Sequence, residues 1–401
     1  MPINNLLLDF IYNHSGDNLI DLLLHSDQFP GINLKLAVNS IEARKKIIEK
    51  VPEWNTIKSL YFPKKLNAEQ ASSMLTALYK QRFSDGGVIV DLTGGYGIDS
   101  FYLSKKTSQL HYIEADPEIY EATMHNFNLL NVNNVVFHNI TIKEGVLSTL
   151  RLPSSSLIYL DPARRRNSDM RHYLIEEYEP NYFAIKDELF NLSSKVLLKV
   201  SPMLDITESL RKIPQIKEIH ILSVGNECKE LLFLIEKDVA TNHSKFNLPV
   251  FTVNFSKSQN EYFDFDLKAE KEATAKYSQG KVYKYIYEPN SSIIKAGAYM
   301  SISLIYNILK LSKHTHLYTS DCLIPDFPGR SFEVIEIMEF KKRDFFNIKK
   351  RYPKANMATR NFPLTVKELR EILKISDGGD IYIFGCMLEE KKILISCRKI
   401  S

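Results

Sequence analysis

The pattern of apolar and polar residues divides the chain into three regions. Ahead of residue 67, apolar residues recur at spacings of three and four, as in Leu34, Val38 and Ile41. This spacing places them on one face of a helix. We therefore expect a small N-terminal helical domain over residues 1–66 that serves in packing rather than in chemistry.

The second region, residues 67–240, alternates short apolar runs with helical stretches. Continuous apolar strands between helices indicate a parallel sheet covered on both faces. The last two runs are separated by a polar stretch around Gly225 that is too short for a helical crossover, so they should pair antiparallel. The predicted fold class is therefore α/β, a Rossmann-like doubly wound sheet with an antiparallel last strand. Its strands are expected to begin at Val88, Leu110, Val135, Leu157, Val196, Ile219 and Leu231.

The third region, residues 241–401, follows a polar stretch and mixes strands such as 332–336 with a helix over 366–373. This mixture predicts a C-terminal α+β domain. Within it, residues 341–351 interleave cations with aromatic residues, as proteins that bind single-stranded nucleic acid do. If this segment is helical, Phe345 and Phe346 are expected on its core face instead.

The composition, with 44% hydrophobic and 25% charged residues, is that of a globular protein. The net charge of +4 permits contact with nucleic acid without requiring it. The four cysteines lack a C-x-x-C pair and metal-ligand spacing, so we expect buried thiols, a reducing compartment and no metal. Nothing approaches the ~20 apolar residues of a membrane span, and a cytoplasmic location without membrane attachment follows by default.

A glycine-rich turn follows the first strand of the second region. Residues 91–99 read Asp-Leu-Thr-Gly-Gly-Tyr-Gly-Ile-Asp. Glycine lets a ligand approach the backbone closely, and a junction from strand to helix suits a phosphate or nucleoside. A second strand that ends in an acid strengthens this motif. We expect a nucleotide-type cofactor on this loop, contacted by Asp91, Thr93, Gly94, Gly95, Gly97 and Asp99.

The acid that ends the second strand is Glu114, a little over twenty residues after Asp91. A carboxylate at this place can accept hydrogen bonds from both ribose hydroxyls of a nucleoside. Asp116 competes for the role. We favour Glu114 because it directly ends the apolar run.

A helix is also predicted just ahead of the glycine loop. Asn67 can cap it and Gln70 can reach back to the capping backbone, before the periodic run that starts at Met74. This helix should pack beside the cofactor, although an ordinary linker helix fits the pattern equally well. We assign Gln70 and Ser73 to the cofactor site.

The fourth strand runs into Asp161-Pro162, which places a carboxylate and a rigid turn at the rim of the ligand crevice. Asp161 is expected to accept a hydrogen bond or a proton from the second substrate, with help from the backbone of Pro162. A helix cap is the alternative role for Asp161. The basic turn that follows can hold nucleic-acid phosphates, although a solvated turn is nearly as good an interpretation. Its residues are Arg164, Arg165 and Arg166.

These motifs resemble those of class I S-adenosylmethionine-dependent methyltransferases. Residues 91–97 match the first motif, Glu114 the ribose-binding acid and Asp161-Pro162 the fourth motif. The antiparallel last strand fits this class and argues against a nicotinamide dehydrogenase. More narrowly, the chain resembles bacterial methyltransferases with a C-terminal THUMP-like domain, through residues 67–73, 161–165 and 359–363.

The resemblance implies S-adenosylmethionine as cofactor and ferredoxin-like and THUMP-like parts in the C-terminal domain. The THUMP name, by analogy, and a loop similar to that of ribosomal guanine-N2 methyltransferases point to RNA. Two features depart from the pattern. The aromatic residue usual after the acid-proline pair is replaced by Ala163 and Arg164, and the usual adenine-reading acid is missing where Asn139 or backbone groups can substitute.

The sequence therefore predicts an S-adenosylmethionine-dependent methyltransferase that acts on a nucleobase in RNA. Two alternatives stay open. The acceptor can be a protein or a small molecule, or the chain can be a non-catalytic RNA-binding protein that retains the cofactor pocket. The acceptor atom, the RNA species and the oligomeric state do not follow from the sequence.

Overall fold

The computed structural model describes residues 3–164, 174–238, 247–257 and 259–400. The chain divides into two compact units. The first comprises Met1–Lys217 and Glu230–Thr241, and the second comprises Glu218–Lys229 and Asn242–Ser401.

A twisted sheet forms the centre of the first unit. Its strands are β1 (Gly86–Asp91), β2 (Thr107–Glu114), β3 (Val135–Asn139), β4 (Leu157–Leu160), β7 (Lys195–Val200) and β9 (Glu227–Glu236), in the order β9-β7-β4-β1-β2-β3. Neighbouring strands pair in parallel, except that β9 runs antiparallel to β7. The predicted α/β sheet with an antiparallel last strand is confirmed. The strand order reverses at β1, and ligands of open α/β sheets bind at the carboxyl ends of the strands at such a point.

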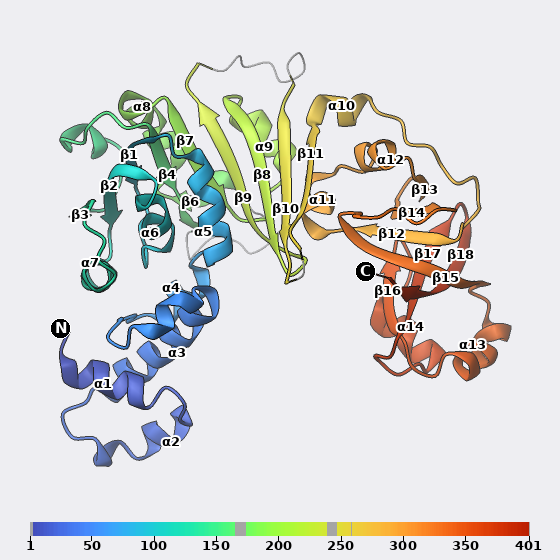
Figure 1. Cartoon of the computed structure of the whole chain (residues 1–401), viewed down its shortest axis with the longest axis horizontal. Coiled ribbons are helices and arrows are strands. Elements are labelled where there is room, and N and C mark those ends of the chain that lie inside the picture. The colour runs from blue at the N-terminus through green and yellow to red at the C-terminus, as the bar shows by residue number, and fades with distance from the viewer. Residues whose placement is uncertain (1–2, 165–173, 239–246, 258, 401) are drawn as a thin grey trace. The chain divides into compact units, whose positions relative to one another are not determined.

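Helices α1 to α4 group together at the blue N-terminal end of the chain, ahead of the helices associated with the sheet (Figure 1). The α-helices of this unit are α1 (Asn5–Asn13), α2 (Leu19–Leu24), α3 (Leu34–Lys50), α4 (Lys65–Gln70), α5 (Met74–Lys80), α6 (Ile98–Ser104), α7 (Pro117–Leu129), α8 (Tyr182–Leu192) and α9 (Ile206–Lys212). Short 3-10 turns lie at Ser26–Gln28, Pro52–Thr56, Gln81–Phe83, Leu147–Thr149 and Ile175–Glu177. A two-stranded ribbon pairs β5 (Ala163–Arg164) with β6 (Tyr178–Glu179).

Local capping decides where the helices ahead of the glycine loop begin. Ser73 accepts a hydrogen bond from the backbone N–H of Thr76, and the Thr76 hydroxyl accepts one from the N–H of Ser73. The prediction that Asn67 caps this helix is wrong, because Asn67 lies inside the separate helix α4. The backbone becomes extended at Ala71, with ψ 149°, so the periodic run from Met74 starts a new helix.

One hydrophobic core joins the N-terminal helices to the helices beside the sheet. Trp54 is 1% exposed, and its ring stacks on Phe62 with centroids 6.3 Å apart and meets Phe101 of α6 edge-on at 5.3 Å. Ile47 of α3 and Tyr96 of the glycine loop belong to the same cluster. The domain boundary at residue 66 stays a prediction, and side chains on both sides of it share this core.

The second unit is α+β, as predicted. In its first part, β10 (Pro249–Phe255) pairs in parallel with β8 (Ile216–Val224) and antiparallel with β11 (Glu261–Asp266). A seven-stranded sheet follows, in the order β13-β14-β12-β15-β18-β17-β16. Its strands are β12 (Tyr285–Pro289), β13 (Leu309–Ser312), β14 (Thr315–Ser320), β15 (Gly329–Glu339), β16 (Asn356–Arg360), β17 (Ile381–Leu388) and β18 (Lys391–Lys399). The helices are α10 (Leu267–Glu272), α11 (Ser291–Ala296), α12 (Ser301–Ile305), α13 (Phe345–Arg351) and α14 (Val366–Leu373), with a 3-10 turn at Lys342–Asp344.

The structure corrects one expectation drawn from composition. Cys386 and Cys397 are buried thiols as expected, but Cys322 is exposed and Cys228 is half-buried, so the expectation is wrong for these two. The buried pair lies on β17 and β18, whereas Cys322 follows β14. Across the described ranges, no helix is long and apolar enough to cross a membrane.

The contact between Asn126 and Tyr61 offers a test of this packing. The buried Asn126 amide on α7 accepts a hydrogen bond from the Tyr61 N–H and donates one to the Tyr61 carbonyl, both at 2.8 Å. Asn126→Ala should leave both backbone groups unsatisfied and lower the free energy of unfolding by about 2 kcal/mol. Urea denaturation measures the change. Asn128→Ala, at an exposed position of the same helix, is the control, and an equal effect of both variants would contradict the prediction.

Candidate active site

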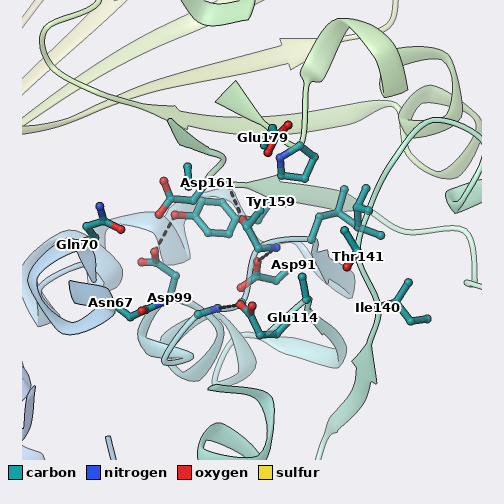
Figure 2. A pocket seen from close by; sticks show the side chains of 18 of the residues that line it. Asn67, Gln70, Asp91, Asp99, Glu114, Ile140, Thr141, Tyr159, Asp161 and Glu179 are labelled. Atoms are coloured by element: carbon teal, nitrogen blue, oxygen red, sulfur yellow. Dashed lines mark hydrogen bonds between the residues drawn. The ribbon is translucent and has the colours of Figure 1, made fainter. Parts of the chain in front are cut away.

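A pocket of about 580 Å³ opens where β1, β2 and β4 end (Figure 2). This volume is typical of sites for small molecules and cofactors. Its walls come from the glycine loop, the end of β2, the segment after β3, helix α4 and the start of α8. The residues predicted for the cofactor site that line it are Gln70, Asp91, Thr93, Gly94, Gly95, Gly97, Asp99 and Glu114.

The glycine loop is a tight turn whose glycines are required by geometry. Gly95 and Gly97 have φ of +54° and +72°, in the left-handed region that favours glycine. At Gly94 the restriction is contact, because a Cβ atom would come within 2.0 Å of the Tyr112 ring. A Cβ atom at Gly95 would meet no neighbour closer than 4.0 Å, so this position of the pocket lining faces open space.

Asp91 stabilises this loop through two hydrogen bonds. Its Oδ1 atom accepts a hydrogen bond from the Thr93 N–H at 3.0 Å, and its Oδ2 atom accepts one from the Ser100 hydroxyl. Burial raises the pKa of Asp91 to about 7, although these two donors lower it. Asp91 therefore shapes the loop from a fully buried position.

Glu114 lies in the pocket at the end of β2, as Figure 2 shows. Its two oxygens accept hydrogen bonds from the backbone N–H groups of Gly95 and Asp116, both at 2.8 Å. Burial raises the pKa of Glu114, and these N–H groups oppose the rise. Since each carboxylate oxygen accepts more than one hydrogen bond, the group can still receive two hydroxyls of a ligand.

The competitor Asp116 has other partners. Its side chain caps α7 by accepting hydrogen bonds from the N–H groups of Glu118 and Ile119, and it forms an ion pair with Lys64. Burial raises the pKa of Asp116, but the Lys64 ammonium outweighs this and lowers it below the ordinary value. Asp116 does not line the pocket, so the arrangement favours Glu114 as the ligand-binding acid.

Asp161 lines the pocket just after β4, and its partners are a lysine and a threonine. Its backbone N–H donates to the Thr93 hydroxyl at 2.6 Å, and its Oδ2 atom lies 2.5 Å from the Lys199 Nζ atom. Burial raises the pKa of Asp161 even though the Lys199 ammonium lowers it. In the described part of the chain, the side chain caps no helix, and a raised pKa makes it a better proton acceptor.

A network of buried charges that the sequence did not predict reaches the pocket through Asp99 and Tyr159. Lys80 is fully buried, with its Nζ atom 2.8 Å from Asp99 and 2.6 Å from Glu230. The Tyr159 hydroxyl donates to Asp99 at 2.7 Å, as Figure 2 shows. Burial raises the pKa of Asp99, but Lys80 and Lys199 bring it below the ordinary value.

Ser72 connects this network to the pocket wall. Its hydroxyl donates to Asp99 at 2.7 Å and accepts from Lys80 at 3.1 Å and Lys199 at 3.2 Å. The sequence carries one signal for the network, because Lys199 interrupts the apolar run of β7. Lys80, at the end of a helical pattern, gives no such signal.

Some predicted site residues lie elsewhere. Ser73 caps α5, and its neighbour Ser72 lines the pocket instead. Asn139 is exposed and donates to the Glu114 carbonyl, while the following residues Ile140 to Ile142 line the pocket. Pro162 is buried and does not line it. The backbone of Arg164 forms β5, and its side chain, like Arg165 and Arg166, lies outside the described part.

The arrangement suits a nucleoside ligand beside a polar rim. The glycine loop offers open backbone and Glu114 offers a carboxylate for ribose hydroxyls, while Asp161 presents a hydrogen-bond acceptor with a raised pKa in the lining of the same pocket. Across the described residues, no group of three or more His, Cys, Asp and Glu side chains is placed to hold a metal ion.

Two domain-family models match parts of the second unit. In the second unit, a ferredoxin-like domain model matches residues 285–328 and a THUMP domain-like model matches residues 329–399. A comparison with the curated proteins gave no match.

The α/β sheet with its antiparallel last strand has the fold of class I methyltransferases, and a comparison with a solved structure shows the family. The crystal structure of a "putative methyltransferase" from Porphyromonas gingivalis W83 is 32% identical to the chain, with a TM-score of 0.87 over 98% of each chain. The chain belongs to the family of this protein, bacterial methyltransferases that carry a C-terminal THUMP-like domain.

More distant likenesses add no argument about function. An rRNA methylase from Streptococcus thermophilus is 15% identical over 41% of this chain and 94% of its own. A SAM-dependent methyltransferase from Aquifex aeolicus is 14% identical over 40% of this chain and 89% of its own. Both have a TM-score of 0.30.

Burial of Asp91 should make stability depend on pH. Because the folded-state pKa of about 7 lies above the unfolded value, the folded protein binds more protons between these values, and the free energy of unfolding falls as pH rises. Relative to that of Asp91→Asn, the free energy of unfolding of the wild type should fall by on the order of 3 kcal/mol between pH 5 and pH 8. Urea denaturation at each pH measures this difference.

Asp116→Asn is the control for this titration. Its lowered pKa keeps Asp116 ionised in both states above pH 5, so the difference from the wild type should not change between pH 5 and pH 8. A constant difference between the wild type and Asp91→Asn over the same range would show that Asp91 does not titrate there.

Proposed function

We propose that this methyltransferase uses S-adenosylmethionine and transfers its methyl group to a nucleobase in RNA. The observation that carries the cofactor assignment is the position of Glu114 in the pocket, bonded to the N–H of Gly95 in the glycine loop. The observation that carries the acceptor chemistry is Asp161 at the same pocket, with its Oδ2 atom held by Lys199.

The residues present fit a nucleoside cofactor. A carboxylate at the end of the second strand suits two ribose hydroxyls, and the open backbone at Gly95 suits close approach. Gln70 and Thr141 line the same pocket with polar side chains. When bound, S-adenosylmethionine supplies an electrophilic methyl group on a sulfonium, so the protein has mainly to align donor and acceptor.

Asp161 is placed to take the proton that the acceptor loses. Lys199 occupies Oδ2, and within the described residues Oδ1 has no hydrogen-bond partner, so that oxygen can accept a hydrogen bond from an acceptor N–H. Methylation of an acceptor N–H would release a proton, and this carboxylate oxygen would take it. The Lys199 ammonium holds the carboxylate in place while Thr93 fixes the backbone.

Support for RNA comes from the second unit. Its match to a THUMP-like domain points to RNA by analogy. The segment is helical, but the expected core-face position is wrong for Phe346, which is 75% exposed, whereas the ring centroid of Phe345 lies 4.8 Å from that of Phe340. In the sequence, Phe346 stands between Arg343 and Lys350. An exposed aromatic ring between cations suits stacking on an unpaired base.

Binding of S-adenosylmethionine tests the cofactor assignment directly. The intact protein should bind it in isothermal titration, and Glu114→Gln should raise the Kd about tenfold because the neutral amide receives ribose hydroxyls more weakly than the carboxylate. Glu121→Gln, at an exposed position on α7, should bind like the wild type. Absence of binding by the wild type, or equal binding by Glu114→Gln, would refute the assignment.

Transfer of tritium from labelled S-adenosylmethionine tests the acceptor. The label should enter the RNA fraction of a mixture of RNA, protein and metabolites. Asp161→Asn should reduce transfer about 100-fold, because the amide cannot take a proton, while cofactor affinity stays within about twofold.

Asp187→Asn, at an exposed position on α8, is the control for this experiment. Tritium recovered in the protein or metabolite fraction instead of the RNA fraction would show that the acceptor is a protein or a small molecule. RNA binding without transfer to any fraction, unaffected by Asp161→Asn, would mean a non-catalytic RNA-binding protein.

A further inference from the structure

One wall of the pocket is formed by a helix that is too short to be stable by itself. Helix α4 and the two residues after it supply Asn67, Gln70, Ala71 and Ser72 to the pocket lining. In Figure 2, Asn67 and Gln70 lie on this helix beside the site. An isolated helix of six residues does not persist in water, because helix nucleation costs more than so few hydrogen bonds return. The wall therefore depends on contacts from outside.

A lysine of the N-terminal helices supplies these contacts. Lys50, the last residue of α3, donates from its Nζ atom to the carbonyls of Ala68 at 2.9 Å, Glu69 at 2.6 Å and Ala71 at 2.6 Å. The last carbonyls of a helix lack partners within the helix, and a cation at this end also interacts favourably with the helix dipole. Lys50 thus closes the end of α4 at the point where the chain enters the pocket.

The other end of α4 is fixed to the glycine loop. The Tyr96 hydroxyl accepts a hydrogen bond from the Lys64 N–H at 2.6 Å and donates one to the Lys64 carbonyl at 2.9 Å. The next residue, Lys65, forms an ion pair with Glu42 of α3 at 2.8 Å. The wall therefore has fixed contacts at both ends, from α3 and from the loop that faces the cofactor.

Apolar packing supports the same arrangement. Ile47 of α3, Ala68 of α4 and Tyr96 of the glycine loop belong to one buried cluster, and Ile47 and Ala68 have no exposed surface. Movement of α3 would therefore disturb α4 and the loop together. The spacing of three and four that predicts the N-terminal helices does not predict the contact of α3 with α4. This spacing reports only which apolar residues share a helix face, and Lys50 is not one of them.

We propose that the N-terminal helices hold one wall of the cofactor site, and that Lys50 is a positioning residue for cofactor binding. This inference rests on the proposed function in that the ligand is S-adenosylmethionine. Lys50 acts through the carbonyls of α4. Its loss lets the end of α4 unwind, so Gln70 and Ser72 no longer face the pocket in a fixed geometry.

Titration of the full-length protein with S-adenosylmethionine tests this role. Lys50→Met keeps the length of the side chain and removes its donors, and should raise the Kd about tenfold. Lys50→Arg, which still donates to several carbonyls, should restore binding to within about twofold of the wild type. Lys46→Met is the matched control, because Lys46 lies one turn earlier in α3 and pairs with Glu49 at the surface.

Hydrogen exchange of the free proteins separates positioning from general destabilisation. In Lys50→Met, the amides of residues 66–73 should lose protection while those of β1 and β2 keep it, and Lys46→Met should show neither change. If Lys50→Met does not fold, Lys50→Gln, with a shorter side chain and two donors, should show the same weakening and the same local loss of protection.

The outcomes distinguish this inference from the proposed function. Wild-type affinity and unchanged protection in Lys50→Met would overturn the role of Lys50. Loss of protection spread evenly over the whole first unit would overturn it too, because a general loss of stability would then explain the weaker binding. Absence of binding by the wild type would refute the cofactor assignment, and the exchange of residues 66–73 would still decide whether Lys50 holds the wall.

Discussion

The first unit is organised around a requirement that buried charges be paired. A fully buried ammonium such as Lys80 is tolerated only because Asp99 and Glu230 lie within 2.8 Å of it. These residues come from α5, α6 and β9, so one ionic contact fixes two helices and the last strand relative to each other. Removing one partner would leave an uncompensated buried charge, which is far more costly than losing a surface ion pair.

The same network extends from the structural core to the pocket at the ends of the strands. Ser72 contacts Lys80, Lys199 and Asp99, and Lys199 in turn holds Asp161. Lys199 therefore holds the Asp161 carboxylate and also contacts Ser72 in the wall of the same pocket. This coupling suits a methyl transfer, in which the enzyme gains most by fixing the distance and angle between donor and acceptor. Asp161 of the acid-proline pair supplies the carboxylate, and the buried Lys199 holds its Oδ2 atom.

Structural features that depend on residues close together in the sequence could be predicted well. The alternation of apolar runs and helices gave the α/β sheet, and the short polar stretch at Gly225 gave its antiparallel last strand. Glu114 directly ends an apolar run of the sequence and Asp116 does not, and the structure places Glu114 in the pocket and Asp116 at a helix cap. Features set by tertiary contacts were not predicted. The break after Gln70, the exposure of Cys322 and the ion pairs of Lys80 depend on residues far away in the chain, which periodicity does not report.

The turn at Gly225 has a consequence for how the protein is made. The chain leaves the first unit along β8 and returns along β9, so this unit is discontinuous in sequence. During synthesis, α5 and α6 leave the ribosome long before Glu230 does. Until then Lys80 lacks one of its two carboxylates, and the helices cannot close over it without burying an ammonium that is only partly compensated. Completion of the core must therefore wait for β9, so the first unit can finish folding only after residues 218–229 of the second unit have been synthesised.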